Sequence, residues 1–441
     1  MTPQQEARSP ALRRVAFAGA IGTTIELYDF LIFGTASAIA LNKLFFPTGN
    51  PTVGTLLAFA TFGAGFLVRP LGAIVIGHFG DRVGRKPMLV LTLTVTGACT
   101  ALIGVLPTFA SAGLLAPALL VVLRLLQGFF LGGEQSGAAV LVVESAPANR
   151  RTFYGGWTTI GSPAGIVLGS LAFSLATAVS GNAFLSWGWR LPFLFSVILI
   201  AVGLYARLSV AESPEFQPLR EARTRARLPI LDVLRGSTPT VLLGAGVNLG
   251  FNAFVFVLAN FFLSYGTANL HLPRQDLLNI SLIGGAAQVI AIPLFTLLSD
   301  RIRREPVMLG GALFLVVFAF PLFAMLDTRN LGLAGLAIAL GYAGSAAIFG
   351  PMAAYYADLF DTRIRYSGAA LSYQLGAVLG GGFSPLIATA LLGVDHGRSW
   401  PVALYLLAAG LVSTGCLIAL TILRRRSGPG PRRGGRSGPR R

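Results

Sequence analysis

Charge is scarce in this chain of 441 residues: charged residues make up 12% of it, and hydrophobic residues make up 54%. The mean hydropathy is +0.72, well above the balance of a soluble globular domain. The shortage of charge excludes a soluble fold and predicts a protein that crosses a membrane many times.

Cysteine and histidine are also rare, with two and three residues. Cys99 and Cys416 both lie in apolar runs, as small buried hydrophobic residues do. The sequence contains no HExxH motif, no Cys/His cluster and no GxSxG motif. These absences disfavour a metal site, a cofactor and an integral-membrane enzyme.

Acidic residues are half as common as basic ones, which gives a net charge of +17. The arginines stand at the ends of apolar runs rather than along one face, so they do not predict nucleic-acid binding. Of the 34 Lys and Arg residues, 27 fall on the side of the N-terminus and only four on the opposite side. This bias predicts an inner-membrane protein with both termini in the cytoplasm.

Twelve apolar runs are long enough to cross the bilayer as helices. We therefore predict an all-α membrane protein with twelve transmembrane helices in two six-helix halves. Its expected parts are an N-terminal tail (1–14), a first half (15–209), a central cytoplasmic loop (210–238), a second half (239–423) and a disordered basic tail (424–441). The expected spans lie at roughly 15–40, 52–77, 88–107, 114–143, 154–178, 189–209, 239–265, 276–298, 307–326, 331–357, 367–392 and 400–423.

A short basic loop, GHFGDRVGRKP from Gly77 to Pro87, joins the second and third spans. It recurs 219 residues later as SDRIRREP, and half of the chain is about this long. The repeat indicates two copies of one membrane module. It also pairs Asp81, Arg82 and Arg85 with Asp300, Arg301 and Arg304.

Three acids lie deep in apolar spans: Glu26, Asp29 and Glu134. A charge near the bilayer centre costs about 3 kcal/mol or more, so such residues face a cavity or a partner. Glu26 and Asp29 are three residues apart and share one helix face. Two adjacent carboxylates do not both ionise readily in a low dielectric, which predicts that they carry a proton. The alternative is a structural role in which both acids are hydrogen-bonded to neighbouring helices.

The fourth span carries Arg124 and Gln127, both candidates for contact with the solute. The Arg124 guanidinium offers a planar fork to a substrate carboxylate, or it forms a permanent ion pair with Asp29. Arg69 is a second candidate cation, although we expect it to snorkel toward the cytoplasmic face or to pair near a helix end.

The second half has neutral hydrogen-bonding groups inside its spans. These are suited to orienting a polar solute, but such groups also hold membrane helices together. The candidates are Asn248, Asn252, Tyr342, Ser345, Tyr373 and Gln374.

Several motifs, in this order, resemble the major facilitator superfamily and, within it, the metabolite:H+ symporter family. The resemblance covers nearly the whole chain. Leu27 and Gln135 depart from it, since aromatic residues are usual at both positions. The motifs are ELYDF (Glu26–Phe30), RPLG (Arg69–Gly72), GHFGDRVGRKP, RLLQGFFLGGE (ending at Glu134), ESAPANRR (Glu144–Arg151), WRLPF (Trp189–Phe193), ESPEF (Glu212–Phe216) and DLFDTRIRYSG (Asp358–Gly368).

The resemblance implies alternating access, with two halves that rock about a site near the membrane midplane. It also implies a cytoplasmic gate, in which Asp81 caps a helix of the other half while Arg82 or Arg85 pairs with Glu144. The second half offers a loose copy of this gate in Asp358 and Arg363. Tyr28, within ELYDF, is added to the substrate-contacting candidates.

We therefore expect a monomeric, proton-coupled symporter that imports a small polar metabolite, most simply a carboxylate. Glu26, Asp29 and Glu134 would couple the proton, and Arg124 would meet the solute. The alternatives are an exporter or antiporter, a carrier of a zwitterion such as proline or betaine, and a transporter-like sensor.

Overall fold

The computed structural model describes residues 3–83, 85–132, 139, 142–143, 146–208, 236–360, 365–395 and 397–426. Over these residues the regular structure is helical, without a strand. Ten helices are long and apolar enough to cross a membrane, and two shorter apolar helices, Val90–Val105 and Leu115–Leu131, lie where the third and fourth spans were expected. The predicted all-α membrane fold with twelve spans is confirmed.

The first half begins with α1 (Pro3–Ala36), which continues through a π-helical turn, η1 (Ser37–Leu41), into α2 (Asn42–Leu44). The second span is split into α3 (Pro51–Leu67) and α4 (Arg69–Val83). The remaining elements are α5 (Arg85–Val105), α6 (Phe109–Ala112), α7 (Leu115–Leu131), η2 (Ala148–Arg150), α9 (Arg151–Ser180), η3 (Gly181–Ala183), η4 (Gly188–Arg190) and α10 (Leu191–Leu208).

The second half begins with α13 (Thr238–Phe256), which passes through a π-helical turn, η5 (Val257–Phe261), into α14 (Phe262–Ala268). A third π-helical turn, η6, interrupts the eleventh span. The other elements are α15 (Arg274–Ile302), α16 (Arg304–Asp327), α17 (Leu331–Leu359), α18 (Arg365–Ala377), η6 (Val378–Gly382), α19 (Ser384–Val394) and α20 (Trp400–Arg426).

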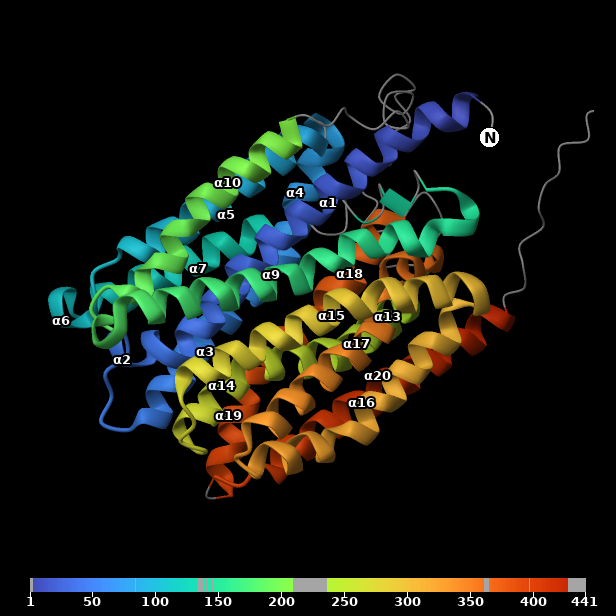
Figure 1. The fold of residues 1–441 in the computed structure, drawn as a ribbon. Coiled ribbons are helices and arrows are strands. Elements are labelled where there is room, and N and C mark those ends of the chain that lie inside the picture. The colour runs from blue at the N-terminus through green and yellow to red at the C-terminus, as the bar shows by residue number, and fades with distance from the viewer. Residues whose placement is uncertain are drawn as a thin grey trace, which may run out of the picture.

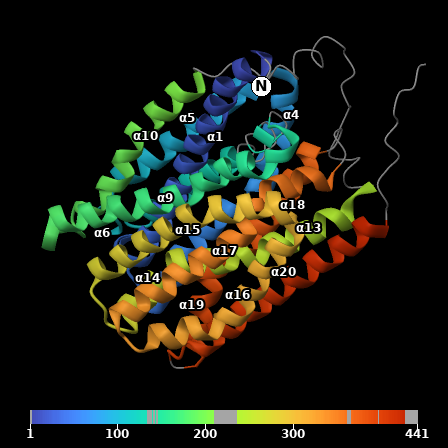
Figure 2. The same cartoon turned by 45° about the vertical axis from the view of Figure 1, so that its right-hand side comes forward.

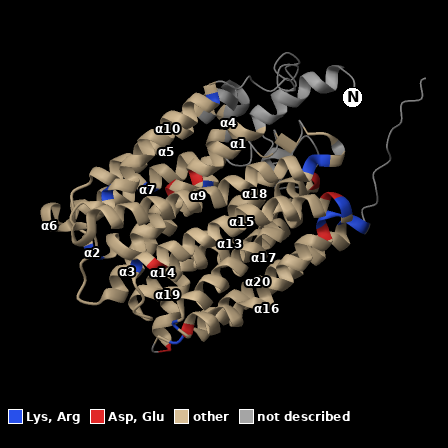
Figure 3. Cartoon of the chain, in the orientation of Figure 1, with Lys and Arg blue, Asp and Glu red and all other residues tan. Residues whose placement is uncertain are grey.

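The two halves lie side by side along their length, blue to green against yellow to red (Figures 1 and 2). Their contact runs through α9, which packs on α15 and α17. The first turns of α1 and the last turns of α20 lie at one end of the bundle, here called the terminal end (Figure 1). Helices α2 and α14 lie toward the opposite end, here called the distal end (Figure 1). Among the described residues, charged positions gather at these ends, and a small group lies inside the first half (Figure 3).

Glycine lets the second and fourth spans touch backbone to backbone. A Cβ atom at Gly128 of α7 would lie 1.8 Å from the carbonyl oxygen of Gly65, and one at Gly132 would lie 2.0 Å from the carbonyl oxygen of Arg69. Side chains larger than hydrogen would push these helices apart. This close contact with α7 fixes the position of the Arg69 backbone.

Two of the π-helical turns occupy corresponding places in the repeat. η1 begins at Ser37 and η5 begins at Val257, 220 residues further on. Both turns lie in the first span of their half, near the distal end, and η5 also contacts α1. A π-helical turn locally disturbs the i to i−4 hydrogen-bond ladder and commonly marks a functional position in a helix.

Candidate transport site

A small cavity lies between the two halves, in the middle of the bundle. Its volume is about 30 Å³, room for only a few water molecules. A metabolite is larger than this, so the structure corresponds to a closed state in which the two halves pack around the central cavity. The first half contributes Arg69 and Ser162 as polar wall groups, and the second half contributes Asn252, Gln288 and Tyr373.

Arg69, which lines this cavity, forms an ion pair with Glu26. Arg69 Nη2 lies 3.2 Å from Glu26 Oε1, and the two side chains are 4% and 2% exposed. Of the two expectations for Arg69, snorkelling toward the cytoplasmic face was wrong, and pairing near a helix end is what the structure has. The second span breaks at Val68, so Arg69 is the first residue of α4, and its guanidinium turns inward over the rings of Phe30 (4.0 Å) and Phe66 (4.5 Å).

Arg124 occupies a separate, sealed position. Its side chain is fully buried, and its guanidinium lies 4.3 Å from the ring centre of Phe30, 4.4 Å from Phe33 and 5.1 Å from Phe62. It does not line either interior cavity found among the described residues.

A polar chain continues from Arg124. Its Nη1 donates a 2.6 Å hydrogen bond to Gln127 Oε1, and Gln127 Nε2 donates to Thr100 Oγ1 at 2.8 Å. Asp29, itself buried, acts electrostatically on Arg124. Glu26 is thus bonded to Arg69, and Asp29 acts on Arg124, although both acids lie on one side of α1.

Tyr28 ties two helices together instead of facing the cavity. Its hydroxyl donates a 2.6 Å hydrogen bond to the carbonyl oxygen of Pro192 at the start of α10. The ring is fully buried. The geometry therefore gives Tyr28 a packing role in this closed state.

The neutral candidates of the second half form a linked set. Asn252 Nδ2 donates to Asn248 Oδ1 at 2.7 Å, and Asn248 Nδ2 donates to the carbonyl oxygen of Tyr373 at 2.8 Å. Gln374 Nε2 reaches across to the carbonyl oxygen of Gly132 in the first half, at 3.2 Å. Among these four candidates, Asn252 and Tyr373 line the central cavity.

Sequence reasoning missed Gln288. Its Nε2 donates a 2.9 Å hydrogen bond to Ser345 Oγ, and its side chain lines the cavity from α15. The signal was available, because a buried amide inside an apolar span is costly unless it has partners or a function. Tyr342 is fully buried behind it, and its carbonyl oxygen accepts from Ser345 Oγ at 2.7 Å.

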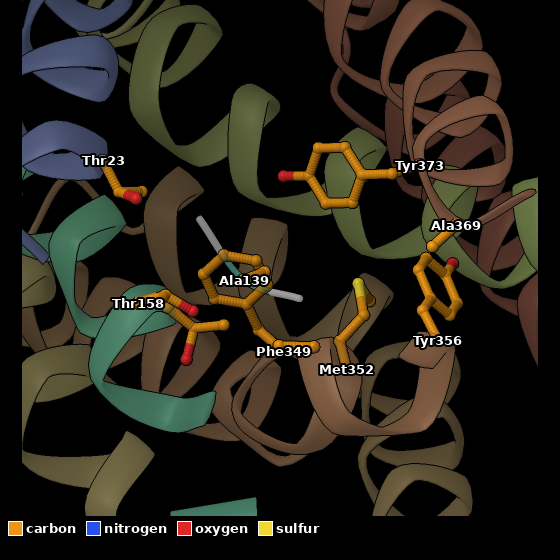
Figure 4. A pocket seen from close by; sticks show the side chains of 10 residues that line it. Thr23, Ala139, Thr158, Phe349, Met352, Tyr356, Ala369 and Tyr373 are labelled. Atoms are coloured by element: carbon orange, nitrogen blue, oxygen red, sulfur yellow. The ribbon is translucent and has the colours of Figure 1, made fainter. Parts of the chain in front are cut away.

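A second cavity of about 50 Å³ lies nearer the terminal end. Thr23 and Thr158 of the first half face Tyr356 and Tyr373 of the second half across it (Figure 4). Phe349 and Tyr373 line both cavities. These two rings therefore stand between the central cavity and the terminal end.

At the terminal end the halves are joined by a gate built on the second copy of the basic loop. Asp300 accepts hydrogen bonds from the backbone N–H groups of Thr152 (3.3 Å) and Phe153 (3.0 Å), at the N-terminus of α9. Arg304 Nε donates to Thr152 Oγ1 at 2.9 Å, and Arg304 also pairs with Asp358. An acid at a helix N-terminus is favoured by the helix dipole.

Of the other predicted gate residues, only Arg301 has a described side chain. Arg301 is exposed on the last turn of α15. The side chains of the remaining predicted gate residues, and that of Glu134, lie outside the described part of the chain. The gate residues concerned are Asp81, Arg82, Arg85, Glu144 and Arg363.

Removing the Asp300 carboxylate should loosen this gate. Loss of a helix cap costs about 1–2 kcal/mol, so Asp300→Ala should raise the population open at the terminal end about five- to thirtyfold. A cysteine placed at Thr23, in the cavity behind the gate, should then react faster with a polar thiol reagent. Asp276→Ala, at the distal end of the same helix, is the matched control. Equal labelling rates in the two variants would contradict the assignment.

Comparison with known proteins agrees with this architecture. The family model of the Major Facilitator Superfamily matches residues 19–371 and 259–441. The chain is similar to the solved structure of the proton:xylose symporter XylE bound to 6-bromo-6-deoxy-D-glucose, with a TM-score of 0.75 at 15% identity over 96% of this chain and 97% of that one. At that identity the likeness concerns the fold.

The sequence relatives are more similar. The shikimate transporter of Escherichia coli (strain K12) is 41% identical over 405 residues, which is 91% of this chain and 92% of that protein. The inner membrane metabolite transport protein YhjE of the same organism is 38% identical, with 93% of each chain covered. Its proline/betaine transporter is 32% identical, over 91% of this chain and 82% of that protein.

Fold, repeat and matches together define a multi-pass membrane transporter, and not an enzyme: the chain belongs to the major facilitator superfamily. Within that superfamily it is a member of the metabolite:H+ symporter family. Among the described residues, no group of three or more His, Cys, Asp and Glu side chains comes together at a possible metal site.

Proposed function

We propose that this protein imports a small polar carboxylate together with a proton, by alternating access across the inner membrane. Both termini would face the cytoplasm, as the Lys and Arg distribution predicts. The terminal end would then be the cytoplasmic gate, and the distal end would open to the outside. A single chain contains both halves and the cavity between them, so the proposed unit is a monomer.

The observation that carries the proposal is that Arg69, on the wall of the central cavity, forms an ion pair with the buried Glu26. Charged groups inside a membrane are costly and usually mark a solute or proton pathway. Here an acid that can take up a proton is bonded to a guanidinium that can hold a carboxylate. Both ligands of a symporter therefore have a partner at one place.

Charge balance supports coupling. Glu26 and Asp29 are both buried acids, and Arg69 and Arg124 are both buried cations. These four groups sum to zero when the acids are ionised, and again when one proton and one solute anion are bound together. A state with only one of the two ligands leaves a net charge, which costs about 3 kcal/mol or more in an apolar interior. Both ligands should therefore cross together.

The cavity wall favours a solute with hydroxyl groups beside its carboxylate. Ser162, Asn252, Gln288 and Tyr373 all present donors or acceptors in the cavity wall. The name of the shikimate transporter, a relative at 41% identity, fits the same class. Shikimate, a hydroxylated ring carboxylate, is therefore the first compound to test.

A zwitterion is the second candidate. Phe251, Phe256 and Phe349 also line the cavity, and aromatic faces attract quaternary ammonium groups. The proline/betaine transporter is the relative that favours this possibility.

The test uses purified protein in lightly buffered proteoliposomes. Shikimate, other hydroxylated carboxylates, betaine, proline and neutral sugars are added singly while the external pH is recorded. We expect external alkalinisation with a hydroxylated carboxylate, and loss of uptake when an uncoupler removes the proton gradient. Movement of protons only against solute flow would identify an antiporter. Alkalinisation with betaine alone would favour the zwitterion.

A further inference from the structure

We infer that Arg69, rather than Arg124, binds the carboxylate of the solute, and that Glu26 is the acid whose protonation releases it. The inference rests on the proposed function and assigns its two key steps to named atoms. Sequence alone favoured Arg124, because that residue stands near the middle of an apolar span. In the structure Arg69, and not Arg124, lines the central cavity.

Arg69 and Arg124 differ first in whether a solute in the central cavity can reach them. Arg69 lines the central cavity, together with groups from both halves. Arg124 is enclosed by the rings of Phe30, Phe33 and Phe62. A Cβ atom added at Gly65 would lie 2.8 Å from Arg124 Nε, so α3 covers it on a further side. A solute would have to displace aromatic core residues to reach Arg124.

The bonding of the two arginines differs as well. Arg124 Nη1 is engaged by Gln127 within its own helix, and Gln127 is fixed by Thr100. Arg69 is held by the Glu26 carboxylate. A solute carboxylate has the same shape and charge as Glu26, so it can replace Glu26 on Arg69 with little change in geometry.

The backbone keeps Arg69 in position while its partner changes. Its carbonyl oxygen is packed against Gly132, where a Cβ atom would lie at 2.0 Å. A Cβ atom at Gly72, one turn further along α4, would lie 1.7 Å from the carbonyl oxygen of Phe129. The start of α4 is thus pressed on the end of α7. The Phe30 and Phe66 rings support the guanidinium from α1 and α3.

The charged groups around Glu26 come from several elements. Asp29 lies one turn further along α1, Arg69 comes from α4, and Arg124 from α7 acts on Arg69. Arg207 of α10 approaches α1 one turn before Glu26, since a Cβ atom at Gly22 would lie 2.4 Å from Arg207 Nη2. The side chain of Glu134 is not described. Among the described side chains, three cations (Arg69, Arg124 and Arg207) and one further acid (Asp29) thus lie around Glu26.

The exchange of Glu26 for the solute carboxylate on Arg69 conserves the net charge of the site. A proton from the outside binds the Glu26 carboxylate, and the ion pair between Glu26 and Arg69 is lost. The solute carboxylate then forms the ion pair with Arg69, and the charge of the site is unchanged. On the cytoplasmic side the solute leaves, the proton leaves Glu26, and the original pair forms again.

The test compares two double variants that each remove one acid and one arginine. These are Glu26→Gln with Arg69→Gln, and Asp29→Asn with Arg124→Gln. Exchange of labelled shikimate is measured in proteoliposomes against competition by unlabelled shikimate or by its carboxamide, which has no charge. We expect the first double variant to lose the preference for the carboxylate, by about tenfold or more. The second should keep that preference.

Single variants give an independent readout. Glu26→Gln should still exchange shikimate, with a rate that no longer depends on pH and without uphill accumulation. Arg69→Lys keeps the charge and should keep the carboxylate preference with a raised KM. Elution as a single folded species and a thermal transition are checked for each variant before assay.

The outcomes are distinct. Loss of preference in the variant without Arg124, with preference retained in the variant without Arg69, would overturn the inference and restore Arg124 as the solute cation. If wild-type protein moves no carboxylate of the panel, the proposed function itself fails, and the inference fails with it. If wild type exchanges shikimate but both double variants keep the preference, neither arginine binds the carboxylate.

Discussion

Asp29→Asn should nearly abolish transport, and removal of Arg124 in the same protein should restore most of it. Asp29 is the buried acid that acts electrostatically on Arg124, which is itself fully buried. Removing one of two opposite buried charges costs about 3–5 kcal/mol, because the remaining charge stays in an apolar interior. Transport and folded yield should therefore fall about 10²-fold or more. The measurements are shikimate uptake and the thermal transition in detergent.

The double variant separates two roles for Asp29. If this acid only balances Arg124, Asp29→Asn with Arg124→Gln should recover both the thermal transition and proton-driven accumulation. If Asp29 is the proton carrier, the double variant should fold but move solute only downhill. Asp327→Asn is the matched control: Asp327 accepts from the hydroxyls of Tyr265 and Ser399 (2.5 Å each), and an asparagine can keep such bonds.

The fold was predictable from the sequence because the bilayer imposes strict rules. Apolar runs of about 20 residues must be helical, and the described spans appear in the expected order. The repeat of the basic loop likewise placed Asp300 at a contact between the halves. The Arg69–Pro70 pair that follows Val68 is a sequence signal for a helix boundary, but the run at 52–77 is apolar enough to be predicted as one continuous span.

The site was predictable only in part. The cost of buried charge identified Glu26, Asp29 and Arg124, but cost does not indicate which partner offsets it. That depends on the break before Arg69 and on the glycine contact at Gly132, which turn one arginine toward the cavity. Spacing along one helix suggested that Glu26 and Asp29 act as a pair. In three dimensions Glu26 is bonded to Arg69, and Asp29 acts on Arg124.

Gly34→Ala should stop the transport cycle while leaving solute binding from outside. Gly34 lies near the distal end of α1, opposite Asn260 in the π-helical turn η5. A Cβ atom at Gly34 would lie 1.9 Å from Asn260 Oδ1 and 2.5 Å from Asn260 Cγ. Asn260 is fully buried, so its side chain has no free space to enter. The first spans of the two halves then cannot close against each other at the proposed outer gate.

A carrier that cannot close outside cannot open inside, because both gates would then be open together. We expect Gly34→Ala to lose shikimate uptake and exchange. A cysteine at Ser37, buried in η1 in the closed state, should become reactive to a membrane-impermeant thiol reagent. Gly49→Ala is the matched control, since a Cβ atom there would meet nothing within 4 Å.

A compensating change makes the prediction specific to this contact. Asn260→Ala removes the side chain that the added methyl group meets, so Gly34→Ala with Asn260→Ala should regain transport and lose the thiol reactivity at position 37. Wild-type uptake by Gly34→Ala alone would show that the halves close elsewhere. Recovery only in the double variant would identify the paired π-helical turns, 220 residues apart in the repeat, as the surfaces on which the outer gate closes.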